Sequence, residues 1–312
     1  MADFYREHGG CVLSTSINRY MYLTIHPYFD ETRTALKYSQ NEIVSDINDI
    51  RHSIFHCVLN ERHISGVEIS SRADVPSGTG LGSSSSFTVR LIHTLACYKG
   101  KYISKSRLAE EACEVEIQKL GAPIGKQDQY AAAFGGLNFI TFHRDDTVSV
   151  EPVIAKAGTI TQLQESLVMF YTGQTHNANQ ILTEQKRNIG QADKTRNLIR
   201  MCELAKAMKK SLEKTIWAIL ALSWTKAGGK SGNWQTASQI RNSTRYMRAL
   251  WKTERPEESS WAPTAGAFSV LLPKRKADAA PRETAAKPFP FRFEHDGSSV
   301  VYIGDKYWED AK

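Results

Sequence analysis

The spacing of apolar and polar residues divides the chain into short strands and longer helices. Apolar runs at residues 11–15 and 20–25 predict two early strands that form a hairpin or lie as neighbours. Apolar positions at helical spacing predict a helix over residues 45–62, with Ser45 as its N-cap. The same criteria predict further strands at residues 66–71, 137–142, 147–153 and 167–171, and helices at residues 87–98, 104–120, 126–134, 177–188 and 192–214. Strands and helices mixed in both halves indicate an α+β protein with a cleft between two domains.

The chain beyond residue 214 is less regular. Residues 215–270 hold five of the six tryptophans, and seven Lys or Arg against three Glu and no Asp. Residues 277–287 are rich in Ala and Pro and predict a linker. Residues 291–294 and 300–302 then predict a closing hairpin.

Composition excludes several classes of protein. The 312 residues are 41% hydrophobic and 23% charged, as in an ordinary globular protein rather than a disordered one. Five cysteines without a CxxC pair favour a reducing cytoplasm, and the first residues lack the features of a signal peptide. No apolar run approaches the roughly 20 residues that span a bilayer, so we expect no membrane partner. The net charge of +7 is not gathered into a basic arm, so we expect no nucleic-acid partner either.

A glycine-rich loop at residues 76–86 carries the clearest chemistry. Gly78, Gly80 and Gly82 alternate with other residues, which lets the backbone adopt positive φ and approach a ligand closely. The serines that follow begin a helix, whose free N–H groups and dipole favour an anion. No Lys follows the last glycine, as a P-loop requires, and the spacing does not fit a dinucleotide fingerprint. The loop therefore predicts a phosphate cradle, and a flexible loop that caps a helix is the alternative.

Residues 76–84, PSGTGLGSS, resemble the second motif of the GHMP kinases, the family of galactokinase, homoserine kinase, mevalonate kinase and phosphomevalonate kinase. Residues 116–121 and 123–136 are similar to the bacterial branch that phosphorylates D-glycero-D-manno-heptose 7-phosphate at its anomeric hydroxyl. The resemblance covers residues 3–214 and 271–303. It implies an ATP- and Mg²⁺-dependent sugar-phosphate kinase for surface polysaccharide precursors, with a ribosomal S5-like ATP-binding domain over residues 1–160 and a ferredoxin-like domain over residues 161–312.

The resemblance also implies a role for individual residues. Asp128 matches the acidic residue beside the attacking hydroxyl, and Ser84 and Glu116 match the groups that hold magnesium. The residues matched to ATP binding are Pro76, Gly78, Gly80, Leu81, Gly82, Ser83, Ser84 and Ser85. The residues expected near the sugar phosphate are Lys126, Gln127, Thr172, Thr175 and His176. From the residues alone, Glu116 could equally be a solvated charge on a helix face, and Asp128 a capping residue.

Two departures from the family leave the activity of this chain open. The sequence begins after the place of the family's GGGTD segment, so we expect the first domain to lack its opening strand and to expose a sheet edge. Residues 259–268 keep one glycine where the family has a late glycine-rich loop, and residues 215–270 resemble no part of the family. A compensated frame shift, a sequencing error or a replacement domain would each produce this window. The alternatives to the heptose kinase are a catalytically impaired nucleotide- or sugar-binding relative and a kinase of another sugar, and a homodimer stays open.

Overall fold

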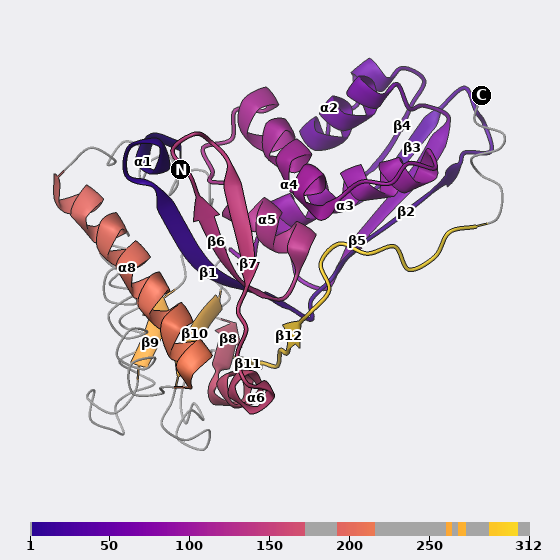
Figure 1. Cartoon of the computed structure of the whole chain (residues 1–312). Helices are drawn as coiled ribbons and strands as arrows, with labels where there is room; N and C mark the ends of the chain where they lie inside the picture. The colour runs from indigo at the N-terminus through magenta and orange to yellow at the C-terminus, as the bar shows by residue number, and fades with distance from the viewer. Residues whose placement is uncertain (1, 172–191, 216–259, 264–267, 273–286, 305–312) are drawn as a thin grey trace. The chain divides into compact units, whose positions relative to one another are not determined.

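The computed structural model describes residues 2–171, 192–215, 260–263, 268–272 and 287–304 (Figure 1). Contacts divide the chain into two compact units, each built from separate stretches of sequence. The first unit comprises Met1–Asn18, Gly78–Leu81 and Gly136–Glu294, and the second comprises Arg19–Ser77, Gly82–Gly135 and His295–Lys312. The expected boundary between residues 160 and 161 separates the two domains of the family. The two contact-based units do not test that boundary, so it stays a prediction.

The first unit contains two antiparallel sheets, ordered β12-β1-β6-β7 and β11-β8-β10-β9. Its elements are α1 (Ala2–His8), β1 (Gly10–Ile17), β6 (Leu137–Phe142), β7 (Val148–Pro152), α6 (Ala157–Ser166), β8 (Val168–Tyr171), α8 (Ala192–Lys214), β9 (Ser260–Pro263), β10 (Phe268–Leu272), β11 (Lys287–Phe289) and β12 (Phe293–Glu294). Helix α8 packs against β1. Leu163 and Leu167 meet Met208 and Leu212 in a buried cluster, which fastens the C-terminal turns of α8 to the end of α6.

The second unit contains one mixed sheet, ordered β2-β5-β3-β4, in which β3 runs parallel to β5. Its elements are β2 (Met21–Pro27), β3 (Thr34–Lys37), β4 (Asn41–Val44), the 3₁₀ turn η1 (Ile47–Asp49), α2 (Ser53–Arg62), β5 (Val67–Ala73), α3 (Ser83–Tyr98), α4 (Lys105–Cys113), the π-helix η2 (Glu114–Lys119) and α5 (Gln127–Phe134). Helix α3 packs on β2 with one face and on α4 and α5 with others (Figure 1). Leu91, Ile92 and Leu95 of α3 are fully buried, which makes this helix the centre of the unit.

Two glycines fix where α5 ends. Gly135 has φ +67, and a Cβ built on it would lie 2.1 Å from the backbone nitrogen of Gly297. A Cβ on Gly297 would in turn lie 2.2 Å from the carbonyl oxygen of Ala133. Only glycine fits at both positions, because the two backbones touch there.

Several predicted elements are confirmed by the structure. The helix predicted over residues 192–214 is α8, and the strand predicted over residues 137–142 is β6. Strands at 66–71, 147–153 and 167–171 and the helix at 126–134 match β5, β7, β8 and α5 to within a few residues. The helix predicted over 104–120 is present, but it becomes a π-helix after Cys113. The sequence analysis missed α1, β3, β4 and α6.

The helix predicted over residues 45–62 is wrong, because it is interrupted. The Glu42 carboxylate accepts the backbone N–H of Arg51 at 2.7 Å and that of His52 at 3.3 Å, which holds the chain extended between η1 and α2. His52 rather than Ser45 caps α2, since its side chain accepts the N–H of Phe55. The interruption depends on the carboxylate of Glu42, ten residues before His52. The spacing of apolar residues within the helix gives no sign of this contact.

Three further expectations are corrected. Strands β1 and β2 belong to different sheets rather than to one hairpin. The closing hairpin does not form, because β12 pairs with β1 at Ser16 and Ile17 and residues 300–302 are not a strand. Helix α3 begins at Ser83 rather than at residue 87, where the apolar spacing placed its start, and its first turn is formed by the serines that the glycine-rich loop had indicated. The helix predicted over 177–188 and all but the last residue of the linker predicted over 277–287 lie outside the described residues.

Little of the irregular window is described. Within residues 215–270 the structure describes Thr215, β9 and the start of β10. Strand β10 pairs with β8 and β9, so the end of the window joins the second sheet of the first unit. Within the described ranges, no helix combines the length and apolar character that crossing a bilayer requires.

Candidate active site

The glycine-rich loop has the backbone geometry that its composition predicted. Gly78, Gly80 and Gly82 have φ of +75°, +80° and +69°, all in the region that glycine adopts without strain. Gly82 is the N-cap of α3, and no side chain caps this helix end. The first-turn N–H groups of α3 therefore keep their capacity to bind an anion, which the helix dipole favours.

A buried carboxylate lies behind the start of α3. Glu116 of η2 is only 3% exposed, and its Oε1 accepts a hydrogen bond from Ser84 Oγ at 2.7 Å. Its Oε2 accepts a second hydrogen bond, from Gln129 Nε2 of α5, at 2.6 Å. Ser84 itself is exposed. The serine hydroxyl is thus the solvent-facing end of a short polar chain that leads inward to Glu116 and Gln129.

The environment of Glu116 disfavours its negative charge. Burial raises the pKa of the carboxyl group, hydrogen bonds from Ser84, Gln129 and Ser85 lower it, and the nearby charge of Asp128 raises it again. No Lys, Arg or His forms an ion pair with Glu116 in the parts of the chain that are described. A cation bound beside Ser84 would therefore compensate a charge that the protein leaves incompletely compensated.

Asp128 lies in the first turn of α5, directly against the start of α3. A Cβ on Gly82 would lie 3.4 Å from Asp128 Cβ and 3.5 Å from its Oδ2. Asp128 is exposed, yet desolvation by the surrounding protein raises the pKa of its carboxyl group, while a hydrogen bond from the Gln127 side chain lowers it. The structure thus brings Gly82, Ser84, Glu116 and Asp128 together from α3, η2 and α5.

The residues present fit a magnesium ion. Mg²⁺ prefers hard oxygen ligands and keeps several of its waters, so one hydroxyl and one carboxylate next to a polyphosphate suffice. Gln129 is fully buried, and its Oε1 has no hydrogen-bond partner among the described residues, which leaves an acceptor beside Glu116 for a metal-bound water. Ser84 would face the ion and Glu116 would supply the charge.

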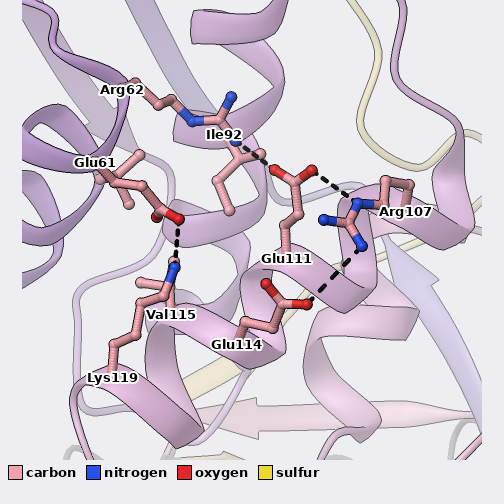
Figure 2. Close-up of a pocket in the computed structure, with 9 residues that line it drawn as sticks. Glu61, Arg62, Ile92, Arg107, Glu111, Glu114, Val115 and Lys119 are labelled. Carbon is pink, nitrogen blue, oxygen red and sulfur yellow. Dashed lines mark hydrogen bonds and ion pairs between the residues drawn. The ribbon is translucent and has the colours of Figure 1, made fainter.

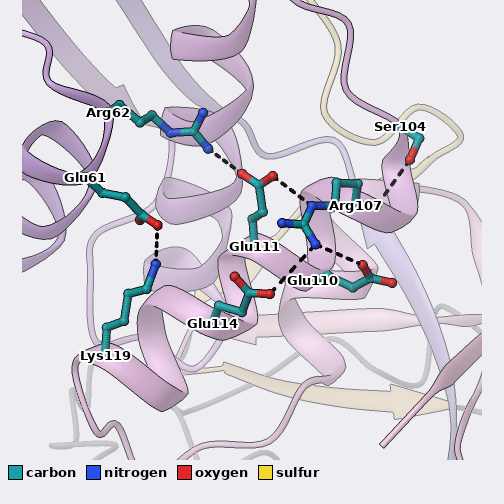
Figure 3. Close-up of polar contacts among 8 residues, drawn as sticks. All are labelled: Glu61, Arg62, Ser104, Arg107, Glu110, Glu111, Glu114 and Lys119. Atoms are coloured by element: carbon teal, nitrogen blue, oxygen red, sulfur yellow. Dashed lines mark hydrogen bonds and ion pairs between the residues drawn. The ribbon is translucent and has the colours of Figure 1, made fainter.

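The carboxylates on the other side of the same helical segment are paired differently. Figure 2 shows a pocket of about 230 Å³ lined by residues of α2, α3, α4 and η2. There Glu111 pairs with Arg62 and with Arg107 Nε at 3.0 Å, and Lys119 Nζ lies 2.6 Å from Glu61 Oε1. Figure 3 shows that Arg107 also reaches Glu110 and Glu114. Every carboxylate in this network therefore has a cation beside it.

The remaining predicted site residues divide into two groups. Lys126 is the half-buried N-cap residue of α5, and Gln127 is exposed beside Asp128, so both are near the site. Thr172, Thr175 and His176 lie outside the described residues. In the loop, Pro76, Gly78 and Gly80 are exposed and Leu81, Gly82 and Ser83 are half-buried, whereas Ser85 is 4% exposed and directs its hydroxyl to Glu116.

Sequence analysis missed one residue of the site. Gln129 received no role, although it supplies one of the two shortest hydrogen bonds to Glu116. The signal was a glutamine on the buried face of α5, where Tyr130 and Ala133 are its neighbours. A glutamine on such a face needs polar partners inside the protein.

Comparison with known proteins shows what the chain resembles. Residues 49–136 match the family model of the GHMP kinase N-terminal domain. Over 234 residues the chain is 29% identical to a D-glycero-alpha-D-manno-heptose 7-phosphate kinase of Campylobacter jejuni, covering 70% of this chain and 69% of that protein. It is also 27% identical to a galactokinase of Thermotoga maritima over 149 residues, which span 42% of that enzyme.

Solved structures give the same fold. The chain is similar to a D-glycero-D-manno-heptose 1-phosphate kinase of Bacteriodes thetaiotaomicron, with a TM-score of 0.74 and 21% identity over 96% of this chain and 93% of that one. A Lactococcus lactis galactokinase in complex with galactose aligns with a TM-score of 0.64 and 13% identity over 96% and 91%. The expected α+β, two-domain fold is confirmed, and residues 49–136 carry the match to the GHMP kinase N-terminal domain.

Proposed function

We propose that this protein is an ATP- and Mg²⁺-dependent sugar-phosphate kinase that acts on the anomeric hydroxyl of D-glycero-D-manno-heptose 7-phosphate. The observation that carries the proposal is the contact between Asp128 and the N-cap glycine of α3, Gly82. It sets a candidate base beside an anion-binding helix end, and phosphoryl transfer requires these two groups side by side.

The loop and the start of α3 would bind the triphosphate of ATP. Backbone N–H groups at the uncapped helix end donate to phosphate oxygens, and the glycines at positions 78, 80 and 82 allow the close approach. Such donors are fixed before the reaction begins, so they stabilise charge as it develops on the transferred group.

Asp128 would orient and deprotonate the attacking hydroxyl. As the anomeric oxygen bonds to the terminal phosphorus, the bond to the leaving ADP breaks and the hydroxyl proton passes to the carboxylate. The raised pKa of Asp128 favours this proton transfer, because a base is most effective when its pKa lies nearer the working pH.

Ser84, Glu116 and Gln129 would form the magnesium-binding end of the site. A bound Mg²⁺ neutralises charge on the phosphate oxygens. Ser84 would present its hydroxyl oxygen to the ion and Glu116 would supply the negative charge behind that hydroxyl, while Gln129 holds the carboxylate by a hydrogen bond.

The heptose 7-phosphate is proposed from the relative of that name, which matches more of this chain than the galactokinase does. The cytoplasmic location and a homodimer stay predictions.

A second candidate function is a relative that binds nucleotide without transfer. It is favoured by β9, because Ser260–Pro263 form a strand where the family's late glycine-rich loop was expected.

The test is product formation by the full chain. Purified protein is mixed with ATP and Mg²⁺, and ADP release is compared for heptose 7-phosphate, galactose and no sugar, with Asp128→Asn as the inactive control. The proposal expects release above background only with the heptose phosphate. Thermal stabilisation by ATP without product would favour the binding relative, and turnover of galactose alone would overturn the substrate.

A further inference from the structure

A second site lies in the first unit, among residues to which the kinase chemistry assigns no role. A cavity of about 530 Å³ opens between β1, the turn that follows β6, and α8. Its lining includes Cys11 of β1 and Cys202 of α8, together with Arg144 and Lys206. The two cysteines are 191 residues apart in the sequence and meet at this cavity.

The two thiols face one another. Cys11 Sγ lies 3.5 Å from the carbonyl oxygen of Cys202, and Cys202 Sγ lies 3.7 Å from the carbonyl oxygen of Cys11. Cys11 is 7% exposed, whereas Cys202 is only half-buried, so a molecule in the cavity meets Cys202 first.

The surroundings stabilise the thiolate of Cys202. The hydrogen bond from Cys11 lowers the pKa of Cys202, the positive charge of Lys206 lowers it further, and desolvation and Glu203 oppose both effects. The pKa of Cys11 is raised, chiefly by its hydrogen bond with Cys202 and by burial. These shifts favour a thiolate at Cys202 and a thiol at Cys11, which is the arrangement found in reactive dithiols.

The other three cysteines differ. Burial raises the pKa of Cys57 and of Cys97, and it raises that of Cys113 to about 12. None of the three lines this cavity. Thiol reactivity at mildly acidic pH should therefore be concentrated at Cys202.

We propose that Cys202 is a modification site for small anionic disulfides and that Cys11 resolves the adduct, joining β1 to α8 by a disulfide. The anionic preference follows from the lining, where the two cations Arg144 and Lys206 outnumber the single carboxylate, that of Asp145. This inference is independent of the proposed kinase function.

The chemistry balances with one equivalent of the disulfide. The Cys202 thiolate attacks one sulfur, the S–S bond of the small disulfide breaks, and one small thiolate leaves. Cys11 then loses its proton to that thiolate or to solvent and attacks the Cys202 sulfur. The second small thiol leaves, the two cysteines are oxidised to one disulfide, and the small disulfide is reduced to two thiols.

The experiment treats the full chain with glutathione disulfide at pH 6 and follows it by intact mass and peptide mapping. We expect Cys202 to react about tenfold faster than Cys97, because the pKa of Cys202 is lowered to about 6 and about half of it is thiolate at that pH, whereas the pKa of Cys97 is raised. The final product should be a Cys11–Cys202 disulfide. Cystamine, a cationic disulfide, should react more slowly than glutathione disulfide.

Variants separate the two roles. Cys11→Ser should accumulate the mixed disulfide at Cys202, Cys202→Ser should leave position 11 unmodified, and Cys97→Ser is the matched control that behaves as the unsubstituted chain. Peptide mapping of the unsubstituted protein gives the same answer should a variant fold poorly. Equal reaction at all five cysteines would overturn the site. A mixed disulfide that persists in the unsubstituted chain would overturn the resolving role of Cys11, and faster reaction with cystamine would overturn the anionic preference.

Discussion

The carboxylates on and around α4 and η2 differ in how their charge is compensated. Glu111 and its neighbours in Figures 2 and 3 are paired with Arg62, Arg107 and Lys119 at the surface of the second unit. Glu116, on the next turn, is buried and accepts hydrogen bonds from neutral hydroxyl and amide groups. A charge that is neutralised within the protein serves structure, whereas a buried charge with neutral partners retains the capacity to bind a cation.

Substitution of Asp128 is expected to have the largest effect. It tests whether the residues gathered around Glu116 take part in catalysis. Asp128→Asn keeps the size of the side chain and removes the proposed base. We expect kcat to fall by about 10²-fold or more, since a positioned base contributes roughly 10²–10⁴-fold. ATP affinity, measured by calorimetry, should change little. A kcat within a factor of about three of the unsubstituted chain would remove Asp128 from the mechanism.

A matched pair of substitutions tests the comparison directly. Glu116→Gln should raise the Mg²⁺ concentration for half-maximal rate by about tenfold, because the carboxylate behind Ser84 is lost. Glu111→Gln should leave that requirement unchanged but lower the free energy of unfolding by about 1–3 kcal/mol, because Arg62 and Arg107 lose a partner. Metal titrations and urea unfolding of both variants give the two readouts. If the two variants changed the Mg²⁺ requirement and the free energy of unfolding alike, the distinction between Glu116 and Glu111 would be wrong.

Gly82→Ala tests the contact between α3 and α5. The new Cβ would lie 3.4 Å from Asp128 Cβ, at a residue with φ +69. We expect ATP affinity to fall by about tenfold or less, because the added methyl group would fill the space between the helix end and the Asp128 carboxylate. Gly121→Ala is the control, because Gly121 has φ +65 and no atom within 4 Å of a built Cβ. An equal loss of affinity in both variants would point to backbone strain alone.

The smallest effect is on stability against pH. The folded pKa of Glu116 is raised by burial, so the folded state retains this proton at pH values where the unfolded state has lost it. Stability from this group is complete below the ordinary pKa and is lost as pH rises through the folded pKa, at no more than about 1.4 kcal/mol per pKa unit. Glu116→Gln should flatten that part of the stability curve, measured by urea unfolding from about pH 4 to pH 7. If the free energy of unfolding of the variant fell with pH as steeply as that of the unsubstituted chain, other groups would be responsible for the loss of stability.

Many helices and strands could be predicted from local sequence patterns. Features that depend on contacts between residues distant in the sequence could not. Helix α8 and strand β6 followed from periodicity because their apolar faces repeat without interruption. The break before α2 did not, because the Glu42 side chain holds it open from ten residues upstream. The same limit applies to the site: a helix position could not distinguish Glu116 from Glu111, since the difference between them is made by Ser84 and Gln129 on other elements.

The π-helix that carries Glu116 has an evolutionary consequence. A π-turn is an α-helix with one additional residue, so a single-codon insertion creates it and a single-codon deletion removes it. Deleting one residue between Glu114 and Glu116 would restore the α-helical register and rotate the following side chains by about 100°. The carboxylate would then be displaced from Ser84 while the ion pairs upstream stayed in place. One small insertion or deletion in such a lineage would therefore create or remove the proposed cation site, without rebuilding the rest of the unit.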